Sequence, residues 1–309
     1  MKRFFRKISI LAIVLVAVNL FFLFAIPKDN NAYLCEYAHK MQLLSDTTSQ
    51  PRVIMIGGSN IAFGIDSKEI GDSLRCRIIN LGLHAGIGIR YPLEDCLKYI
   101  RNGDVVVLQF EYENFFGGDN GEPETFPAFM VATDWRNLSQ LNVYQWKNIL
   151  AGMPSEAVVS MKRLVGFLLR GSFDSPVVNE KFTYVKSGFN EYGDEVSHIS
   201  YPNAQYVSSG KPNTRQVNRG FIDWLAETIG QYEQAGAKVV LLPPVCIESH
   251  LRVSYNDHIE KALARLNHPY LVRPDSMALN DSCMFDKVYH MNEEGIRQNT
   301  RTIIKSLAL

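Results

Sequence analysis

The chain lacks an excess of charge of either sign, because 32 lysines and arginines stand against 32 aspartates and glutamates in 309 residues. Proteins that bind nucleic acids carry clustered cations, and no basic block lies beyond the N-terminus. We therefore expect no nucleic-acid partner. Repeats and low-complexity tracts are missing as well, and 46% of the residues are hydrophobic. This composition excludes a mostly disordered protein.

Cysteine is scarce and scattered, with five residues at positions 35, 76, 96, 246 and 283. No CxxC pair or Cys/His cluster has the spacing of metal ligands. We therefore predict no metal and no other cofactor, and we interpret most cysteines as buried thiols. No Gly-Lys-Ser/Thr follows the glycine pair at 57–58, and its spacing is not that of a dinucleotide-binding loop.

The longest apolar run lies near the N-terminus. Residues 8–26 read ISILAIVLVAVNLFFLFAI and carry no charge. As a helix this run is about 28 Å long, close to the roughly 30 Å of a bilayer's hydrocarbon core. Basic flanks tend to stay in the cytoplasm, and four basic residues precede the run: Lys2, Arg3, Arg6 and Lys7.

We therefore predict a cytoplasmic N-terminus and a single-pass transmembrane anchor over 1–27, with the remaining chain on the periplasmic or extracytoplasmic side. A cleaved signal peptide is one alternative, although its apolar region is usually shorter and ends in a small-x-small site. A buried core helix is the other. Without the four N-terminal cations, the 32 basic residues fall to 28 against 32 acidic ones, so the exported part is mildly acidic.

After a polar linker expected at 28–50, apolar runs alternate with helical patterns over a domain at 51–309. Continuous apolar runs suit strands that are buried on both faces of a parallel sheet. The alternation predicts an α/β, doubly wound fold with five parallel strands. The expected strands are 52–56, 77–81, 104–110, 237–242 and a weaker 269–273, and the expected helices are about 66–75, 91–100, 217–235, 254–266 and 292–307.

One stretch, at about 113–215, separates the third strand from the next helix by far more than a normal connection. Helices are expected in it near 137–151 and 155–170, before a part rich in Gly, Asn, Tyr and Ser. We interpret it as an insertion or cap over the strand ends. It shapes a substrate groove, binds a partner, or is merely irregular.

Ser59 follows the first strand after two glycines, at the carboxyl edge of the sheet. Backbone N–H groups there are available to an oxyanion, although a glycine-rich turn with an N-capping serine is the plain alternative. His290 lies just before the last helix, with Asp286 four residues earlier. A serine nucleophile needs a base and an acid that orients the base. Since both segments follow strands of one parallel sheet, we expect them to converge.

Together these segments resemble the SGNH/GDSL hydrolase superfamily. The resemblance depends on Gly-Gly-Ser-Asn at 57–60, Asn-Leu-Gly-Leu-His-Ala-Gly at 80–86, and Asp286 with Tyr-His-Met-Asn at 289–292. It covers about 51–112 and 237–307 and points to the membrane-anchored, cell-envelope branch that modifies polysaccharides and teichoic acids. It implies a flavodoxin-like domain that acts as an esterase or acyltransferase, often on O-acetyl groups.

The resemblance also implies roles for single residues. Ser59 is the nucleophile, His290 the base and Asp286 the orienting acid. Gly86, with Gly82 as the alternative, donates its N–H to the oxyanion together with the N–H of Ser59, and Asn114 supplies a further donor.

Two departures from the superfamily pattern bear on these roles. Asp usually lies three residues before the histidine, where this chain has Lys287. The usual Gly-x-Asn-Asp block is replaced by Gln-Phe-Glu-Tyr-Glu-Asn at 109–114, in which Glu111 and Glu113 would repel an oxyanion. Loss of one oxyanion donor costs on the order of 10²–10³ in rate.

The sequence thus predicts an exported, membrane-anchored hydrolase or acyltransferase that acts on acyl esters, above all O-acetyl esters, of a cell-envelope or capsular polysaccharide. One alternative is an inactive scaffold of the same fold, partnering a membrane-embedded acyltransferase or a polysaccharide export machine. Another is a carbohydrate-binding module that uses Trp135, Trp146 and the tyrosines of 184–206. His84 and His250 are interpreted as polar surface residues, and Glu111 with Glu113 as a solvated strand end.

Overall fold

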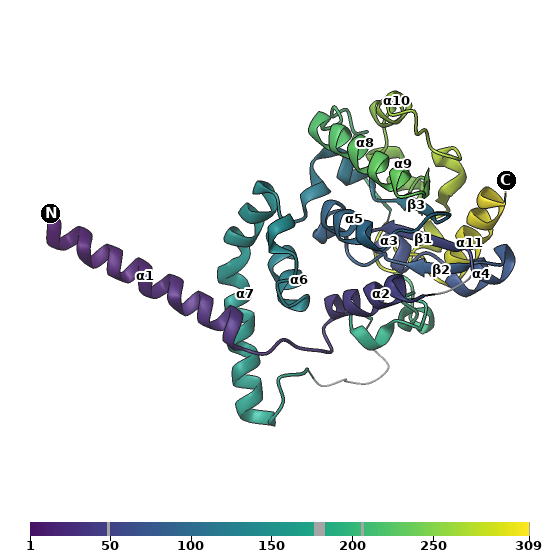
Figure 1. The fold of residues 1–309 in the computed structure, drawn as a ribbon. Helices are drawn as coiled ribbons and strands as arrows, with labels where there is room; N and C mark the ends of the chain where they lie inside the picture. Colours follow the sequence, from purple (N-terminus) through teal and green to yellow (C-terminus); the bar gives the residue numbers. More distant parts are fainter. Residues whose placement is uncertain (48–49, 176–182, 205–206, 309) are drawn as a thin grey trace.

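The computed structural model describes residues 1–47, 50–175, 183–204 and 207–308, with a parallel sheet at the centre of the molecule (Figure 1). The order of its four strands is β2-β1-β3-β4. In the register of the sheet, Ile54 lies opposite Ile79 on one side and Val106 on the other. The strands are β1 (Arg52–Gly57), β2 (Arg77–Asn80), β3 (Val105–Gln109) and β4 (Lys238–Leu241), and a separate parallel pair is formed by β5 (Cys246–Ile247) and β6 (Ala278–Leu279).

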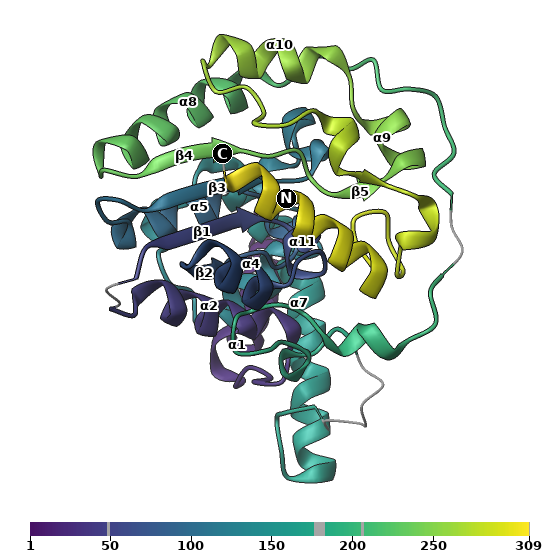
Figure 2. The ribbon, with the colours of Figure 1, turned by 90° about the vertical axis from the view of Figure 1, so that its right-hand side faces the viewer.

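Helices cover both faces of the sheet (Figure 2). Successive strand residues point to opposite faces, so Ile54 packs with one layer of helices and Met55 with the other. Both faces are therefore apolar, which explains why the strands are continuous hydrophobic runs. The first layer contains α2 (Glu36–Ser45), α5 (Arg90–Cys96), α8 (Arg219–Gln234) and α10 (Asp257–Arg265), and the second contains α4 (Ser67–Leu74) and α11 (Glu293–Leu307).

The α/β class and the first four expected strands are confirmed, but the sheet has four strands rather than five. The segment at 269–273 makes one parallel bridge, between Tyr270 and Leu241, and is not a strand. Pro269 and Pro274 flank it, and proline has no N–H to donate to a neighbouring strand. The five expected helices correspond to α4, α5, α8, α10 and α11.

The segment that we expected to be a linker is partly folded. It contains a 3₁₀ turn at Tyr33–Cys35 and the helix α2, in which Lys40 and Leu44 are fully buried. The Lys40 ammonium donates to the backbone carbonyls of Asn80, at 3.1 Å, and Gly193. The polar composition of this segment therefore reflects the buried hydrogen bonds of Lys40 as well as exposure to solvent.

The insertion has two parts that differ in position. Its first part contains α6 (Phe126–Ala132) and one long helix, α7 (Val143–Arg170), where we expected two helices. Pro154 lies inside α7 without ending it. The second part, at 183–204, lies against the sheet's carboxyl edge, where the Glu195 N–H donates to the Ala62 carbonyl at 2.8 Å and Asn80 Nδ2 donates to Asp194 Oδ1 at 2.8 Å.

The N-terminal helix α1 (Lys2–Ala25) extends away from the rest of the chain (Figure 1). It is the one helix of the described residues that is long and apolar enough to cross a membrane. Leu23 and the following Ile26 are buried against the body. Nearly all of the preceding apolar side chains of α1, such as Ile13, are exposed.

Candidate functional site

The first element of the site is the turn from β1 into the short helix α3 (Ser59–Ala62). A Cβ on Gly57 would lie 2.3 Å from the Gln109 carbonyl oxygen, so glycine is needed for β1 to approach β3 here. The buried Asn60 accepts the Gly58 N–H at 3.1 Å and donates to the Gln109 carbonyl at 2.7 Å. These bonds fix Ser59 at the carboxyl edge of the sheet, where it is 8% exposed.

The second element is the loop that precedes α11. His290 Nδ1 lies 2.7 Å from Asp286 Oδ1, as the predicted pairing of base and acid requires. The Tyr184 hydroxyl donates to the other oxygen of Asp286 at 2.5 Å and lies 3.1 Å from His290 Nδ1. Since Asp286 occupies Nδ1, Nε2 is the nitrogen of His290 that is left to accept a proton from a substrate or nucleophile.

Two contacts bring this loop to the Ser59 turn. The Phe63 and His290 rings are stacked, with centroids 4.1 Å apart and planes 6° from parallel. The Phe63 N–H donates to the Ser59 carbonyl at 2.9 Å, so the ring that supports His290 stands one helical turn from the serine. The Tyr289 hydroxyl also donates to Glu113 Oε2 at 2.8 Å, which ties the loop to the end of β3. The predicted residues therefore share one edge of the sheet.

The Ser59 hydroxyl, however, donates to Glu111 Oε1 at 3.0 Å, and no hydrogen bond of the described residues joins it to His290. Glu111 is 5% exposed. Burial, and then the charge of Glu113, raise the pKa of Glu111 to about 8, against opposing hydrogen bonds from Ser59 and the Asn60 N–H. The carboxyl is therefore mostly neutral at pH 7, so it does not repel an oxyanion as the sequence suggested.

The two residues proposed as oxyanion donors have other partners in this structure. The Gly86 N–H donates to His84 Nδ1 at 2.9 Å. Asn114 Nδ2 donates to the Glu111 carbonyl at 3.0 Å. Each bond closes a short local turn, so neither donor is directed at Ser59. The Gly82 N–H is likewise bound, to Asn80 Oδ1 at 2.9 Å.

The protonation states of the histidine and its acid follow from their surroundings. Burial lowers the pKa of His290, and the charges of Lys287 and His198 lower it further, while Asp286 acts in the opposite direction. Burial raises the pKa of Asp286, but hydrogen bonds from His290 and Tyr184 outweigh it, so the net pKa lies below the ordinary value. A neutral imidazole beside an ionised carboxylate is the state that a general base requires.

Two other histidines, His84 and His198, lie close to this site. Burial lowers the pKa of His84 to about 4, with smaller contributions from the charges of Lys287 and His290. His198 is buried, with Nδ1 2.5 Å from Glu195 Oε2 and Nε2 2.9 Å from the Met291 carbonyl. It therefore supports the backbone beside His290.

Sequence reasoning missed Tyr184 and Phe63 as partners of His290, and it set Glu111 aside as solvated. Glu111 carried a usable signal, because it stands two residues past a buried strand at the edge where Ser59 lies. Tyr184 carried none, since it lies in the insertion, 102 residues from Asp286 in the chain. Trp135 packs instead on Phe24 of α1, with centroids 4.9 Å apart. Tyr206 lies outside the described residues.

In the parts of the chain that the structure describes, no group of three or more His, Cys, Asp or Glu side chains is placed to hold a metal ion. All five cysteines are described and are free thiols, and all but Cys76 are buried.

The arrangement of serine, imidazole and carboxylate is suited to acyl transfer.

Comparison with protein-family models, curated proteins and solved structures finds no match to this chain. The case for a function therefore depends on the geometry of the site.

Proposed function

We propose that this chain is a membrane-anchored serine hydrolase or acyltransferase of the SGNH kind, acting on acyl esters of a cell-envelope or capsular polysaccharide. The observation that carries the proposal is the pairing of buried His290 with the half-buried Asp286, with the His290 ring stacked on Phe63 one turn after Ser59. A serine at a strand end, beside a histidine that an acid orients, is the arrangement that activates a hydroxyl nucleophile.

The proposed reaction has two halves. Ser59 Oγ attacks the carbonyl carbon of the ester while its proton passes to His290 Nε2. The bond between the acyl carbon and the sugar oxygen then breaks, and His290 returns the proton to that oxygen. In the second half, water or another sugar hydroxyl attacks the acyl carbon and gives its proton to His290. The bond between the acyl carbon and Ser59 Oγ then breaks, and His290 returns the proton to Oγ. Water makes the protein an esterase, and a sugar hydroxyl makes it a transferase; O-acetyl is the acyl group we favour.

The strand order supports the finer part of the proposed fold. The order β2-β1-β3-β4, continued by the bridge between Leu241 and Tyr270, matches the 2-1-3-4-5 order of flavodoxin-like sheets. In such sheets ligands bind outside the carboxyl ends of the strands, where Ser59 and His290 lie. The proposed location is a single-pass membrane protein with this site on the periplasmic or extracytoplasmic side.

Fluorophosphonate labelling of the full chain in detergent tests the proposal, because these reagents bond to activated serines. We expect labelling that is lost in Ser59→Ala and in His290→Ala. Ser276→Ala is the matched control, since Ser276 is exposed and, within the described part of the chain, bonded only to the Arg273 carbonyl. Unchanged labelling in either site variant would refute the mechanism, and a circular dichroism spectrum shows whether each variant is folded.

The site also favours a second candidate function, an inactive scaffold that partners a membrane-embedded acyltransferase or an export machine. The specific observation is that the Ser59 hydroxyl donates to Glu111. In addition, the Gly86 N–H donates to His84 and the Asn114 amide to the Glu111 carbonyl, so neither is directed at Ser59. Catalytic hydrogen bonds often form only with substrate in place, so this geometry is compatible with both functions. Absence of labelling in the folded wild-type chain would favour the scaffold, and full activity of Ser59→Ala in a polymer-acylation assay would establish it.

A further inference from the structure

The long helix α7 is apolar on a face that packs against no other part of the described chain. Its inner face carries buried residues such as Gln145, Ile149 and Ser160. On the opposite side, residues spaced three or four apart, with one gap of seven, form an outward stripe that is exposed to solvent. The stripe consists of Val143, Leu150, Pro154, Val158, Met161, Val165 and Leu168.

The exposure along this stripe is large. Leu150 is 65% exposed and Leu168 is 74% exposed, and the adjoining Leu169 is 79% exposed. Polar side chains are expected on the solvent face of an amphipathic helix, and a contiguous apolar surface instead marks an interaction site.

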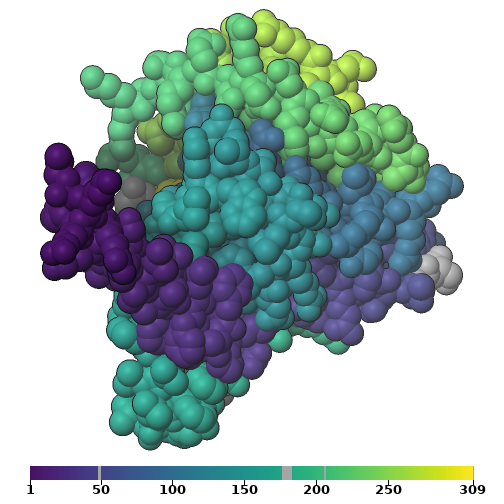
Figure 3. Space-filling model, turned by 60° about the vertical axis from the view of Figure 1, so that its left-hand side comes forward, coloured from purple at the N-terminus to yellow at the C-terminus, as the bar shows by residue number. Residues whose placement is uncertain are grey.

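The helix α1 reaches the body of the protein at α7. Figure 3 shows α1 crossing over α7, and Figure 1 shows that α1 then runs outward from this crossing. Leu23, near the end of α1, is 2% exposed, whereas the apolar residues before it are largely exposed. A bilayer that surrounds the exposed part of α1 therefore ends at the level of α7.

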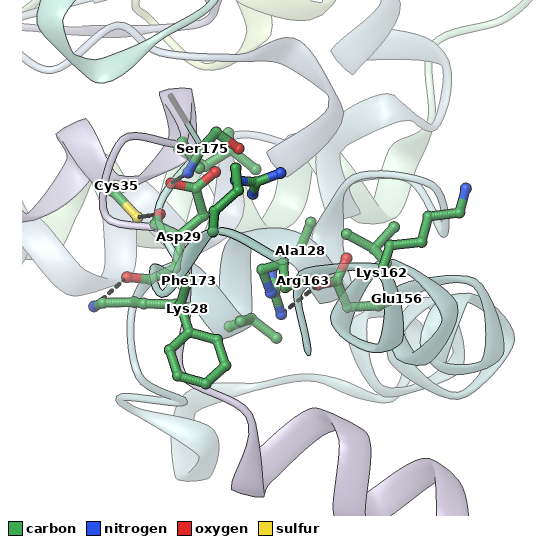
Figure 4. A pocket seen from close by; sticks show the side chains of 15 residues that line it. Lys28, Asp29, Cys35, Ala128, Glu156, Lys162, Arg163, Phe173 and Ser175 are labelled. Atoms are coloured by element: carbon green, nitrogen blue, oxygen red, sulfur yellow. Dashed lines mark hydrogen bonds and ion pairs between the residues drawn. The ribbon is translucent and has the colours of Figure 1, made fainter. Parts of the chain in front are cut away.

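The charges beside the stripe are basic. Along α7, the exposed Lys147 lies within the stripe, between Val143 and Leu150, and Lys162 is exposed near it. The single acidic residue of the helix, Glu156, is buried and 3.4 Å from Arg163. Lys162 and Arg163 also line a pocket of about 350 Å³ between α7 and the residues that follow α1 (Figure 4). Trp146 and Tyr144, at the N-terminal end of α7, are partly exposed, and such side chains are common at membrane interfaces.

We infer that the outward stripe of α7 lies in the headgroup region of the membrane that α1 spans, parallel to its surface. Helices of this kind bury an apolar face at the boundary of headgroups and acyl chains and attract anionic lipids through Lys and Arg. The inference rests on the membrane anchoring proposed above, but not on the chemistry of Ser59. It places the catalytic domain against the bilayer and limits how the domain can rotate about its anchor.

A lipid surface fits this face better than a second protein does. The stripe lies on the helix that α1 crosses, and a bilayer covers the exposed part of α1 in the proposed topology. The exposed charges near the stripe are cationic. A second copy of the chain would bring another helix with the same exposed lysines, Lys147 and Lys162, against this face.

Spin labels on the full chain, reconstituted into vesicles of phosphatidylcholine and phosphatidylglycerol, test the inference. The labelled variants are Val158→Cys and Val165→Cys on the stripe, Val14→Cys in the middle of α1 and Glu69→Cys on the exposed side of α4, each with Cys76→Ser. Cys76 is the native cysteine that is not buried. Power saturation compares how often each spin label collides with oxygen, which concentrates in lipid, and with a nickel chelate, which is water-soluble.

We expect the ratio of oxygen to nickel collisions at 158 and 165 to exceed that at Glu69→Cys several-fold, and to lie below that at Val14→Cys. Nickel access at 158 and 165 equal to that at Glu69→Cys, with Val14→Cys deep in lipid, would overturn the inference and leave the anchor intact. Nickel access at Val14→Cys would refute the anchor itself. Spin–spin broadening between chains at Val165→Cys would assign the stripe to a second copy instead. Fluorophosphonate labelling of the same samples reports on Ser59 independently of these outcomes.

Discussion

The Ser59 hydroxyl donates to Oε1 of Glu111 across 3.0 Å, inside a site where both side chains are buried. Because the pKa of Glu111 is raised to about 8 by burial and by Glu113, this carboxyl holds a proton at neutral pH. A neutral carboxylic acid in an apolar site can donate a hydrogen bond to an oxyanion. Glu111 is therefore placed to donate a hydrogen bond to the oxyanion, a role for which Gly86 and Asn114 are not oriented in this structure.

Replacing Glu111 by glutamine tests this role. Glutamine keeps a neutral donor of similar shape, so the fluorophosphonate labelling rate of Glu111→Gln should stay within about 10-fold of the wild-type rate. Glu111→Ala should lower that rate by a factor on the order of 10²–10³. Wild-type labelling should decline as pH rises through about 8, and Glu111→Gln should not show that decline. Glu69→Gln, on the exposed side of α4, is the control. Equal losses of labelling rate in Glu111→Gln and Glu111→Ala would instead indicate that the Glu111 carboxylate acts as a base.

The same ionisation links stability to pH. The pKa of Glu111 rises from its ordinary value of 4.5 to about 8 on folding, so the folded chain binds the proton more tightly than the unfolded chain. Its contribution to stability is complete below pH 4.5 and is lost as pH rises through about 8, at about 1.4 kcal/mol for each pKa unit. Urea unfolding followed by fluorescence should therefore show less destabilisation between pH 5 and 9 in Glu111→Gln than in the wild type. Parallel pH dependences would contradict the shift.

Tyr184 should act on catalysis through Asp286. Tyr184→Phe removes the hydroxyl that donates to Asp286 Oδ2 at 2.5 Å, so the carboxylate interacts more strongly with protonated His290. The pKa of His290 should then rise, and the acidic limb of the labelling rate should move to higher pH with a maximum lowered by about 10-fold. Tyr144→Phe on α7 serves as the control. A lowered rate with an unmoved pH profile would indicate a structural role alone.

Replacing Asp286 should lower the labelling rate more than replacing Tyr184 does. Asp286→Asn keeps the shape but removes the charge that orients His290, bonded at 2.7 Å. The expected loss in labelling rate is on the order of 10⁴, as for an orienting acid in a serine triad. The matched control is Asp275→Asn, because Asp275 is exposed and paired with Arg273. A loss below about 10-fold in Asp286→Asn would remove Asp286 from the mechanism.

A buried ion pair at the opposite edge of the sheet should affect folding only. Arg52 Nε donates to Asp104 Oδ1 at 2.9 Å, and both side chains are nearly inaccessible. Asp104→Asn leaves the guanidinium buried without its counter-charge, and this should cost about 3–5 kcal/mol of unfolding free energy. The exposed pair of Arg273 and Asp275 is the comparison, since Asp275→Asn should leave stability unchanged. Both variants should be measured by urea unfolding.

Much of the fold was predictable because its signals are local. Strands that are covered on both faces must be apolar throughout, and helices between them must show a helical period, so β1 to β4 and five helices could be found from the sequence. The segment at 269–273 has an apolar pattern too, but whether it forms a strand depends on backbone donors that proline removes. The continuity of α7 across Pro154 was also unpredictable, because packing of its inner face against α6 holds the helix together.

The sequence by itself determined that Ser59 reaches the carboxyl edge of the sheet, because this residue follows the first strand of a parallel sheet. The loop of Asp286 and His290 follows β6 of the separate pair, so tertiary contacts bring it to the same edge: His290 stacks on Phe63, and Tyr289 donates to Glu113. Only the tertiary structure decided that Ser59 donates to Glu111, that Tyr184 reaches Asp286 from the insertion, and that α7 presents an apolar stripe beside α1. These relationships depend on side-chain directions and burial between segments distant in the chain, which no local pattern encodes.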